Sequence, residues 1–403
     1  MKRAIVISAF SGLQFGYNTT VIAGALLLLT NAFSLSPLQQ GIIASMTLFG
    51  ALCTSLFAGT LADRMGRKNS IGLSVLLFTV GCALSAWATS YEQLLVGRLL
   101  IGFGAGIATI VAPLYIIEIA PAELRGAANN LYQMGIALGA LFAYLSNYFL
   151  AEEELWRLMF GLGMLPGVIQ GFGLFFIPES GVRRETRATW SALFEPTYRR
   201  RLLLGGALIG VQSLSGSNAV LYFAPKLLQS TGAHGVLFAT LCLGVIYAVS
   251  TLISASIIDR WGRRFLLFCS LFGMLASLLA VVFASLFHAP FLDKITPFSL
   301  SLYIGAYAIG LGPVPQLVIG EISPPDVRAA ALGITGFLGW VTNYLVVLTV
   351  APMLHLLTLG GTFCLYSLFC LLGVIVVWSY LPETKQKSLE EIDRLFNGGR
   401  PTQ

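Results

Sequence analysis

The stretch DRMGRK, residues 63–68, returns later in the chain as DRWGRR, residues 259–264. Two further signatures return in the same order: EIAPAELR (118–125) as EISPPDVR (321–328), and PES (178–180) as PET (382–384). The three offsets of 196, 203 and 204 residues are nearly equal. Such a spacing is typical of a chain built from two tandem repeats. The repeats therefore predict two similar halves.

The composition indicates a membrane protein. Of the 403 residues, 56% are hydrophobic and only 10% are charged, and the mean hydropathy is +0.82. A soluble domain of this length cannot hide so much apolar surface. The apolar runs are continuous over about 20 residues or more, whereas the strands of an outer-membrane barrel alternate between apolar and polar positions. The chain is therefore expected to form a bundle of transmembrane helices.

The apolar runs predict an all-α integral membrane protein with twelve transmembrane helices in two pseudo-symmetric halves of six. The expected spans cover approximately residues 4–29, 40–62, 70–89, 93–118, 127–150, 156–178, 201–229, 235–258, 265–288, 297–321, 330–354 and 359–381. The expected sections are an N-terminal half at 1–180, a short cytoplasmic linker at 181–200, a C-terminal half at 201–381 and a cytoplasmic tail helix at 382–403.

The positive charges gather on one side of the predicted spans. If the N-terminus is inside, 20 of the 24 Lys and Arg residues fall in cytoplasmic loops, span ends or termini. Cytoplasmic segments of membrane proteins carry such an excess. We therefore expect a multi-pass protein of a cell membrane, either a plasma membrane or a bacterial inner membrane, with both termini in the cytoplasm.

The segment VQSLSGSNAVLYFAP, residues 211–225, places uncharged polar side chains inside an apolar run. Each one costs free energy in a dry bilayer unless it is paired. Interhelical hydrogen bonds are one explanation, but two amides and three hydroxyls around one glycine favour a lined binding site. Gln212 and Asn218 differ by about 120° on a straight helix, so they converge only if the helix bends or unwinds near Gly216.

A set of motifs along the whole chain carries a family resemblance. They are FGYNTTVIAG (15–24), GRLLIGFGAGI (97–107), PLYIIEIAPAELRG (113–126), PES (178–180), QSLSGSNAV (212–220), GLGPVP (310–315) and PETK (382–385), besides the paired DRxGR loops. With these motifs the chain resembles the sugar porter family of the major facilitator superfamily. The resemblance implies a monosaccharide or polyol carrier that works by alternating access, with one central site between the halves.

The resemblance also implies which residues contact the substrate. Side-chain amides suit sugar hydroxyls because they both donate and accept hydrogen bonds without a charge to desolvate. The implied substrate-binding residues are Gln133, Gln212, Ser213, Asn218, Gln316, Trp340 and Asn343. Tyr222 matches an extracellular gating tyrosine, although an interfacial aromatic residue is the alternative. Ser213, Tyr247 and Gln316 depart from residues frequent in the family, which leaves the identity of the sugar open.

Arg98 is the only clear charge inside a predicted span. In proton-coupled relatives its partner is an aspartate of the first span, and by resemblance that position is Asn18 here. Proton-driven carriers need a titratable group in the pathway, and the sequence places no carboxylate or imidazole at mid-membrane. We therefore predict facilitative uniport, with proton–sugar symport through Glu118 or Glu321 as the alternative. A structural arginine that bonds Asn18 and carbonyls is compatible with uniport.

Acids and bases repeat at the cytoplasmic ends of both halves. Such pairs can lock the halves together in one state and part in the other, and static loop stabilisation is the alternative. The predicted cytoplasmic gate residues are Asp63, Arg64, Arg67, Glu118, Arg125 and Glu179 in the first half and Asp259, Arg260, Arg263, Arg264, Glu321 and Arg328 in the second. The glycine-rich GFGAGI (102–107) lacks a following GK[ST], so it favours close helix packing over a nucleotide loop.

These positions provide no catalytic arrangement and no metal-ligand spacing, so we predict neither an enzyme nor a cofactor. The expected partners are a small-molecule sugar and the lipid bilayer, with no nucleic acid, and the chain is expected to act as a monomer. A sugar sensor is disfavoured because the tail has only 22 residues. Drug efflux is disfavoured because QMGIALGALFA (133–143) lacks the proline-containing glycine motif of antiporters.

Overall fold

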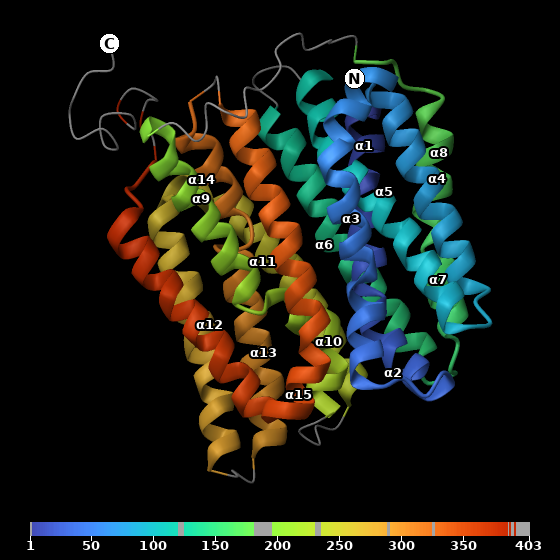
Figure 1. The fold of residues 1–403 in the computed structure, drawn as a ribbon, viewed down its shortest axis with the longest axis vertical. Helices are drawn as coiled ribbons and strands as arrows, with labels where there is room; N and C mark the ends of the chain where they lie inside the picture. Colours follow the sequence, from blue (N-terminus) through green and yellow to red (C-terminus); the bar gives the residue numbers. More distant parts are fainter. Residues whose placement is uncertain are drawn as a thin grey trace. The chain divides into compact units, whose positions relative to one another are not determined.

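The computed structural model describes residues 2–119, 125–180, 196–229, 235–287, 291–324, 327–385, 387 and 391. The regular elements within these residues are all α-helices (Figure 1). They are α1 (Lys2–Thr20), α2 (Ile22–Ala32), α3 (Pro37–Met65), α4 (Arg67–Ala86), α5 (Tyr91–Ile119), α6 (Arg125–Leu150), α7 (Trp156–Leu162), α8 (Met164–Leu174), α9 (Pro196–Leu214), α10 (Ser217–Gln229), α11 (Val236–Trp261), α12 (Arg263–Leu286), α13 (Leu292–Ile309), α14 (Val314–Ile322) and α15 (Arg328–Tyr380).

The helices follow the predicted spans. Within the described residues, nine helical stretches are long and apolar enough to cross a membrane. The last of these, Ala330–Tyr380, contains two helices that meet at Thr358, whose φ of +60° lies outside the helical region. Helix α6 and the α9–α10 pair occupy the two remaining predicted spans. The prediction of an all-α, twelve-span membrane fold is therefore confirmed.

Contacts between Cα atoms divide the chain into two units. Unit 1 comprises Met1–Arg184, Asn218–Ala248 and Tyr344–Leu356, and unit 2 comprises Glu185–Ser217, Val249–Asn343 and Leu357–Gln403. Unit 1 thus joins parts of both predicted halves: the Tyr144 hydroxyl of α6 donates to the Leu221 carbonyl of α10 at 2.7 Å. The units do not follow the sequence repeats, and each is described by itself below.

Close helix packing organises unit 1. Helix α1 packs along α6, and α5 packs along α3 and α4. At Gly102 of α5, a Cβ atom would lie only 2.3 Å from the Thr47 carbonyl oxygen of α3. The glycine-rich stretch therefore lets two helices approach closely, as its sequence favours. In unit 2, α12 packs along α13, and α9 along α14.

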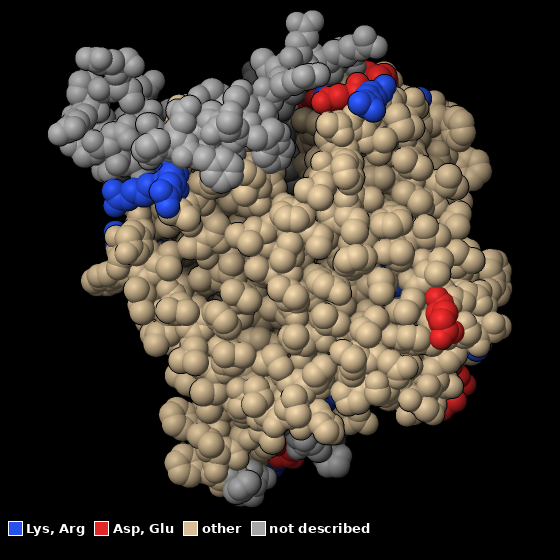
Figure 2. All heavy atoms as spheres, in the orientation of Figure 1, with Lys and Arg blue, Asp and Glu red and all other residues tan. Residues whose placement is uncertain are grey.

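The surface is apolar where a membrane would surround it. The side chains of Phe175, Phe298 and Trp378 are 81%, 73% and 71% exposed. Figure 2 shows a broad area of uncharged side chains over the middle of the visible face, with Lys, Arg, Asp and Glu near its edges. Large exposed apolar patches mark a surface that contacts something other than water, and for helices of this length that surface suits lipid.

Candidate functional site

The seventh predicted span is broken where its sequence becomes polar. Helix α9 ends at Leu214 and α10 begins at Ser217. Between them Gly216 has a φ of +91°, a conformation that glycine adopts without strain. A Cβ atom there would lie 2.5 Å from the Tyr366 ring of α15. The break predicted near Gly216 is thus present, and both the positive φ and the nearby Tyr366 ring require glycine at this position.

Gln212 joins this break to a second one in unit 2. Its Nε2 donates to the carbonyl oxygens of Leu311 at 2.9 Å and Gly312 at 2.6 Å, in the turn between α13 and α14. With both amide hydrogens engaged, Gln212 offers a ligand its oxygen, which accepts hydrogen bonds from hydroxyls.

Other hydrogen bonds hold the same framework. The Tyr303 hydroxyl donates to the Ser215 carbonyl at 2.9 Å, and the Ser217 hydroxyl donates to the Gln212 carbonyl at 3.1 Å. The Leu311 amide donates to the Ser270 hydroxyl at 3.0 Å. Backbone groups freed by the helix breaks are therefore paired by side chains, as a buried site requires.

The predicted substrate-binding residues fall in both units. In unit 2, Gln212, Trp340 and Asn343 are half-buried, Ser213 is buried, and Gln316 is exposed on α14. In unit 1, Gln133 of α6 and Asn218 of α10 are half-buried, and Tyr222 is buried. The Ser213 hydroxyl has no hydrogen-bond partner within the described chain.

Arg98 and Asn18 lie together inside unit 1, and both are 0% exposed. The Arg98 Nη1 donates to the backbone carbonyl of Asn18 at 2.8 Å. The Asn18 side chain is engaged elsewhere: its Nδ2 donates to the Gln14 carbonyl at 3.0 Å, and its Oδ1 accepts from the Cys82 thiol at 2.9 Å. The arginine therefore contacts the backbone of residue 18 and not its amide.

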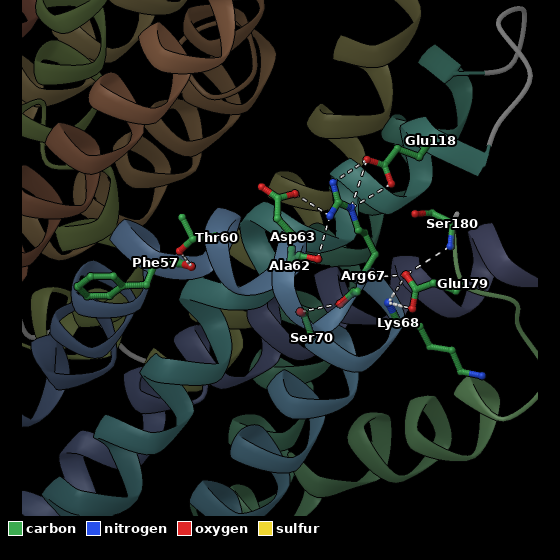
Figure 3. Close-up of polar contacts among 11 residues, drawn as sticks. Phe57, Thr60, Ala62, Asp63, Arg67, Lys68, Ser70, Glu118, Glu179 and Ser180 are labelled. Atoms are coloured by element: carbon green, nitrogen blue, oxygen red, sulfur yellow. Dashed lines mark hydrogen bonds and ion pairs between the residues drawn. The ribbon is translucent and has the colours of Figure 1, made fainter. Parts of the chain in front are cut away.

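A charge cluster lies at the end of unit 1 that holds the N-terminus (Figure 3). Arg67 is 2% exposed, and its guanidinium pairs with Asp63 at 2.7 Å and with Glu118 at 3.2 Å. Glu179 accepts from the backbone N–H groups of Arg67 at 2.6 Å and Lys68 at 3.2 Å. These N–H groups open α4, so the Glu179 carboxylate satisfies and neutralises the positive end of that helix.

Unit 2 repeats this arrangement with its own residues. Arg263 pairs with Glu321 at 2.8 Å. Glu383 accepts from the backbone N–H groups of Arg263 and Arg264, both at 3.0 Å, at the start of α12. The preceding glycines, Gly66 and Gly262, have φ values of +87° and +89°. The sequence repeat is therefore also a repeat of atomic contacts.

The helix-capping role of Glu179 and Glu383 was missing from the sequence prediction. The ion pairs of Arg67 and Arg263 given above each lie within one unit. Arg64 and Arg260 are exposed, and the Arg328 Nε donates to the Ser323 carbonyl at 3.1 Å. The side chains of Arg125 and Asp259 lie outside the described part, as do most of the 181–200 linker and the 382–403 tail helix.

Comparisons with known proteins place the chain among transporters. The family model described as "Sugar (and other) transporter" matches residues 4–185 and 181–396. The plastidic glucose transporter 4 of Arabidopsis thaliana is 31% identical, over 98% of this chain and 80% of that protein. The galactose-proton symporter of Escherichia coli (strain K12) is 29% identical, over 98% of this chain and 94% of that protein. The crystal structure of a D-xylose-proton symporter matches with a TM-score of 0.85 at 28% identity, over 96% of this chain and 99% of that one.

The helical fold, the lipid-facing surface and these relatives define a membrane transporter and not an enzyme. The chain belongs to the sugar porter family of the major facilitator superfamily. The family resemblance seen in the sequence is thereby confirmed.

Proposed function

We propose that this sugar transporter is a facilitative uniporter, which moves a hexose, a pentose or a polyol down its gradient by alternating access. One observation carries the uniport mechanism. Arg98 is fully buried, and the residue whose backbone it contacts is Asn18, an amide that cannot take up or release a proton.

The named relatives act by more than one mechanism, and they include a galactose-proton symporter. A symporter needs an acid that changes its protonation during transport. The acids named as alternatives, Glu118 and Glu321, are engaged with Arg67 and Arg263 at helix ends. Their structural pairing favours uniport over symport.

Counterflow of labelled sugars tests both the substrate class and the mechanism. The purified chain in sealed proteoliposomes is expected to exchange at least one hexose, pentose or polyol. An imposed pH gradient should leave the final internal concentration at equilibrium. Accumulation above equilibrium, or proton uptake that depends on sugar, would rule out uniport. A panel without any exchange would rule out the substrate class.

The proposed substrate site uses Gln133, Gln212, Ser213, Asn218, Gln316, Trp340 and Asn343, with Tyr222 as a gate. Support comes from the broken seventh span and from Gln212, whose side-chain oxygen remains as an acceptor. The proposed cytoplasmic gate uses the two charge clusters. We further propose that the chain acts as a monomer in a cell membrane with both termini in the cytoplasm, and without a nucleic-acid partner.

Substitution of Gln212 tests this site. Gln212→Ala is expected to lower sugar exchange at least tenfold, since it removes the acceptor and leaves two carbonyls unpaired. Exchange is measured in proteoliposomes at matched protein content. Ser256→Ala, which alters an exposed hydroxyl of α11, is the control and should exchange normally. Normal exchange by Gln212→Ala would remove Gln212 from the site.

A further inference from the structure

The guanidinium of Arg98 has more hydrogen-bond donors than the described residues provide partners for. The side chain is 0% exposed, and its one described hydrogen bond runs from Nη1 to the Asn18 carbonyl. Nε and Nη2 are both buried without a hydrogen-bond partner in the described chain. A guanidinium stays protonated in proteins, so these nitrogens remain donors and the side chain remains a cation.

The charge of Arg98 is also uncompensated by its described neighbours. Tyr222 and Cys82 are described ionisable groups near Arg98, and both are ordinarily neutral at pH 7. The ring of Phe160 lies 5.9 Å from its Cζ and provides only a weak cation–π contact. A buried cation without a negative partner is strongly destabilising.

A second residue of α1 also has buried polar atoms without a partner in the described chain. Gln14 lies one turn from Asn18 on α1, and both polar atoms of its side chain are buried without a partner. Buried polar atoms are almost always hydrogen-bonded, and unpaired ones indicate a small polar guest. For the two unused donors of the Arg98 cation, the guest that also balances the charge is an anion.

We propose that a small monovalent anion of the size of chloride binds within unit 1 against Nε and Nη2 of Arg98. The anion supplies the negative charge that the Asn18 amide lacks. It stabilises the folded protein without entering the sugar site. Because the anion has a fixed charge and releases no proton, the site is consistent with uniport but does not depend on it.

Thermal unfolding of the full chain in detergent tests the site with chloride as the probe. Melting temperature is measured while sodium chloride replaces sodium gluconate at constant ionic strength, so that general screening stays equal. Binding to the folded state raises the melting temperature with anion concentration. We expect a saturable rise for the unsubstituted chain. A melting temperature that is the same in both salts would overturn the proposal.

Two substitutions separate this site from general salt effects. Asn18→Asp adds a negative charge to the residue whose backbone carbonyl Arg98 contacts. The rise with chloride should disappear because this charge balances the cation and repels a second anion. Arg157→Gln, which alters an exposed arginine, is the matched control and should keep the full rise. If Asn18→Asp keeps the same rise as the unsubstituted chain, chloride acts elsewhere and the proposal fails.

Direct binding keeps the proposal testable if Asn18→Asp folds poorly. Radioactive chloride in equilibrium dialysis should bind the unsubstituted chain at about one ion per molecule, and Arg98→Met should lose that binding. Equal binding by both would overturn the site. Neither result bears on sugar counterflow, so failure of the anion site and failure of uniport are distinguishable.

Discussion

A single carboxylate caps the N-terminus of α4, and another caps the N-terminus of α12. Glu179 and Glu383 are separated by more than two hundred residues, yet each accepts two backbone N–H groups at the start of a helix. A carboxylate at a helix N-terminus is stabilised by the helix dipole and by charge-assisted hydrogen bonds. The glutamates of the PES and PET signatures thus cap helices, besides belonging to motifs typical of the family.

Removal of one capping charge should destabilise the fold. Glu179→Gln keeps an oxygen acceptor but loses the charge, and we expect a loss of about 1 kcal/mol with a lower melting temperature. Glu383→Gln should do the same. Glu153→Gln, in an exposed turn, is the control and should have little effect. An unchanged melting temperature for both capping variants would contradict the assigned role.

At the scale of secondary-structure elements, two interruptions of predicted spans meet in unit 2. The break between α9 and α10 and the turn between α13 and α14 are connected through Gln212. The Leu311 and Gly312 carbonyls lie in the turn between α13 and α14, where the regular helix is interrupted. This turn therefore supplies the two acceptors that hold the Gln212 amide in place.

The break at Gly216 should not tolerate a side chain. Gly216→Ala places a Cβ atom 2.5 Å from the Tyr366 ring and forces a non-glycine residue to a φ of +91°. We expect a loss of about 2 kcal/mol or more and much slower sugar exchange. Gly210→Ala is the matched control on α9, because a Cβ atom there would meet nothing within 4 Å. Equal stability and transport of the two variants would show that the break is unimportant.

Over the whole molecule, the same contact pattern serves two units. The Arg67 and Arg263 clusters use equivalent motifs, and each is complete within its unit. A gate between the halves requires these charges to change partners during transport. Static pairing needs contacts only within each unit. The gate and the static pairing therefore predict different free energies of unfolding when both clusters are altered.

A double substitution distinguishes the two roles. Arg67→Gln and Arg263→Gln should each lower the melting temperature, because each leaves a carboxylate without its partner. If the clusters act only within their units, the two losses should add to within about 0.5 kcal/mol. Unfolding of the single and double variants measures the coupling. A larger coupling would favour the proposed gate over purely static pairing.

The sequence by itself determined the fold class, the spans and the family, because long apolar runs and repeated motifs are local properties of the chain. It also indicated Gly216 as the place where the seventh span has to bend or unwind if Gln212 and Asn218 share a site, and the helix is broken there. Only the tertiary structure decided which atoms meet. Glu179 and Glu383 cap helices, Gln212 binds the Leu311 and Gly312 carbonyls, and Arg98 contacts a backbone oxygen of Asn18. Such partners are far apart in the sequence and depend on how the helices pack. The periodicity of apolar residues along the chain does not predict them.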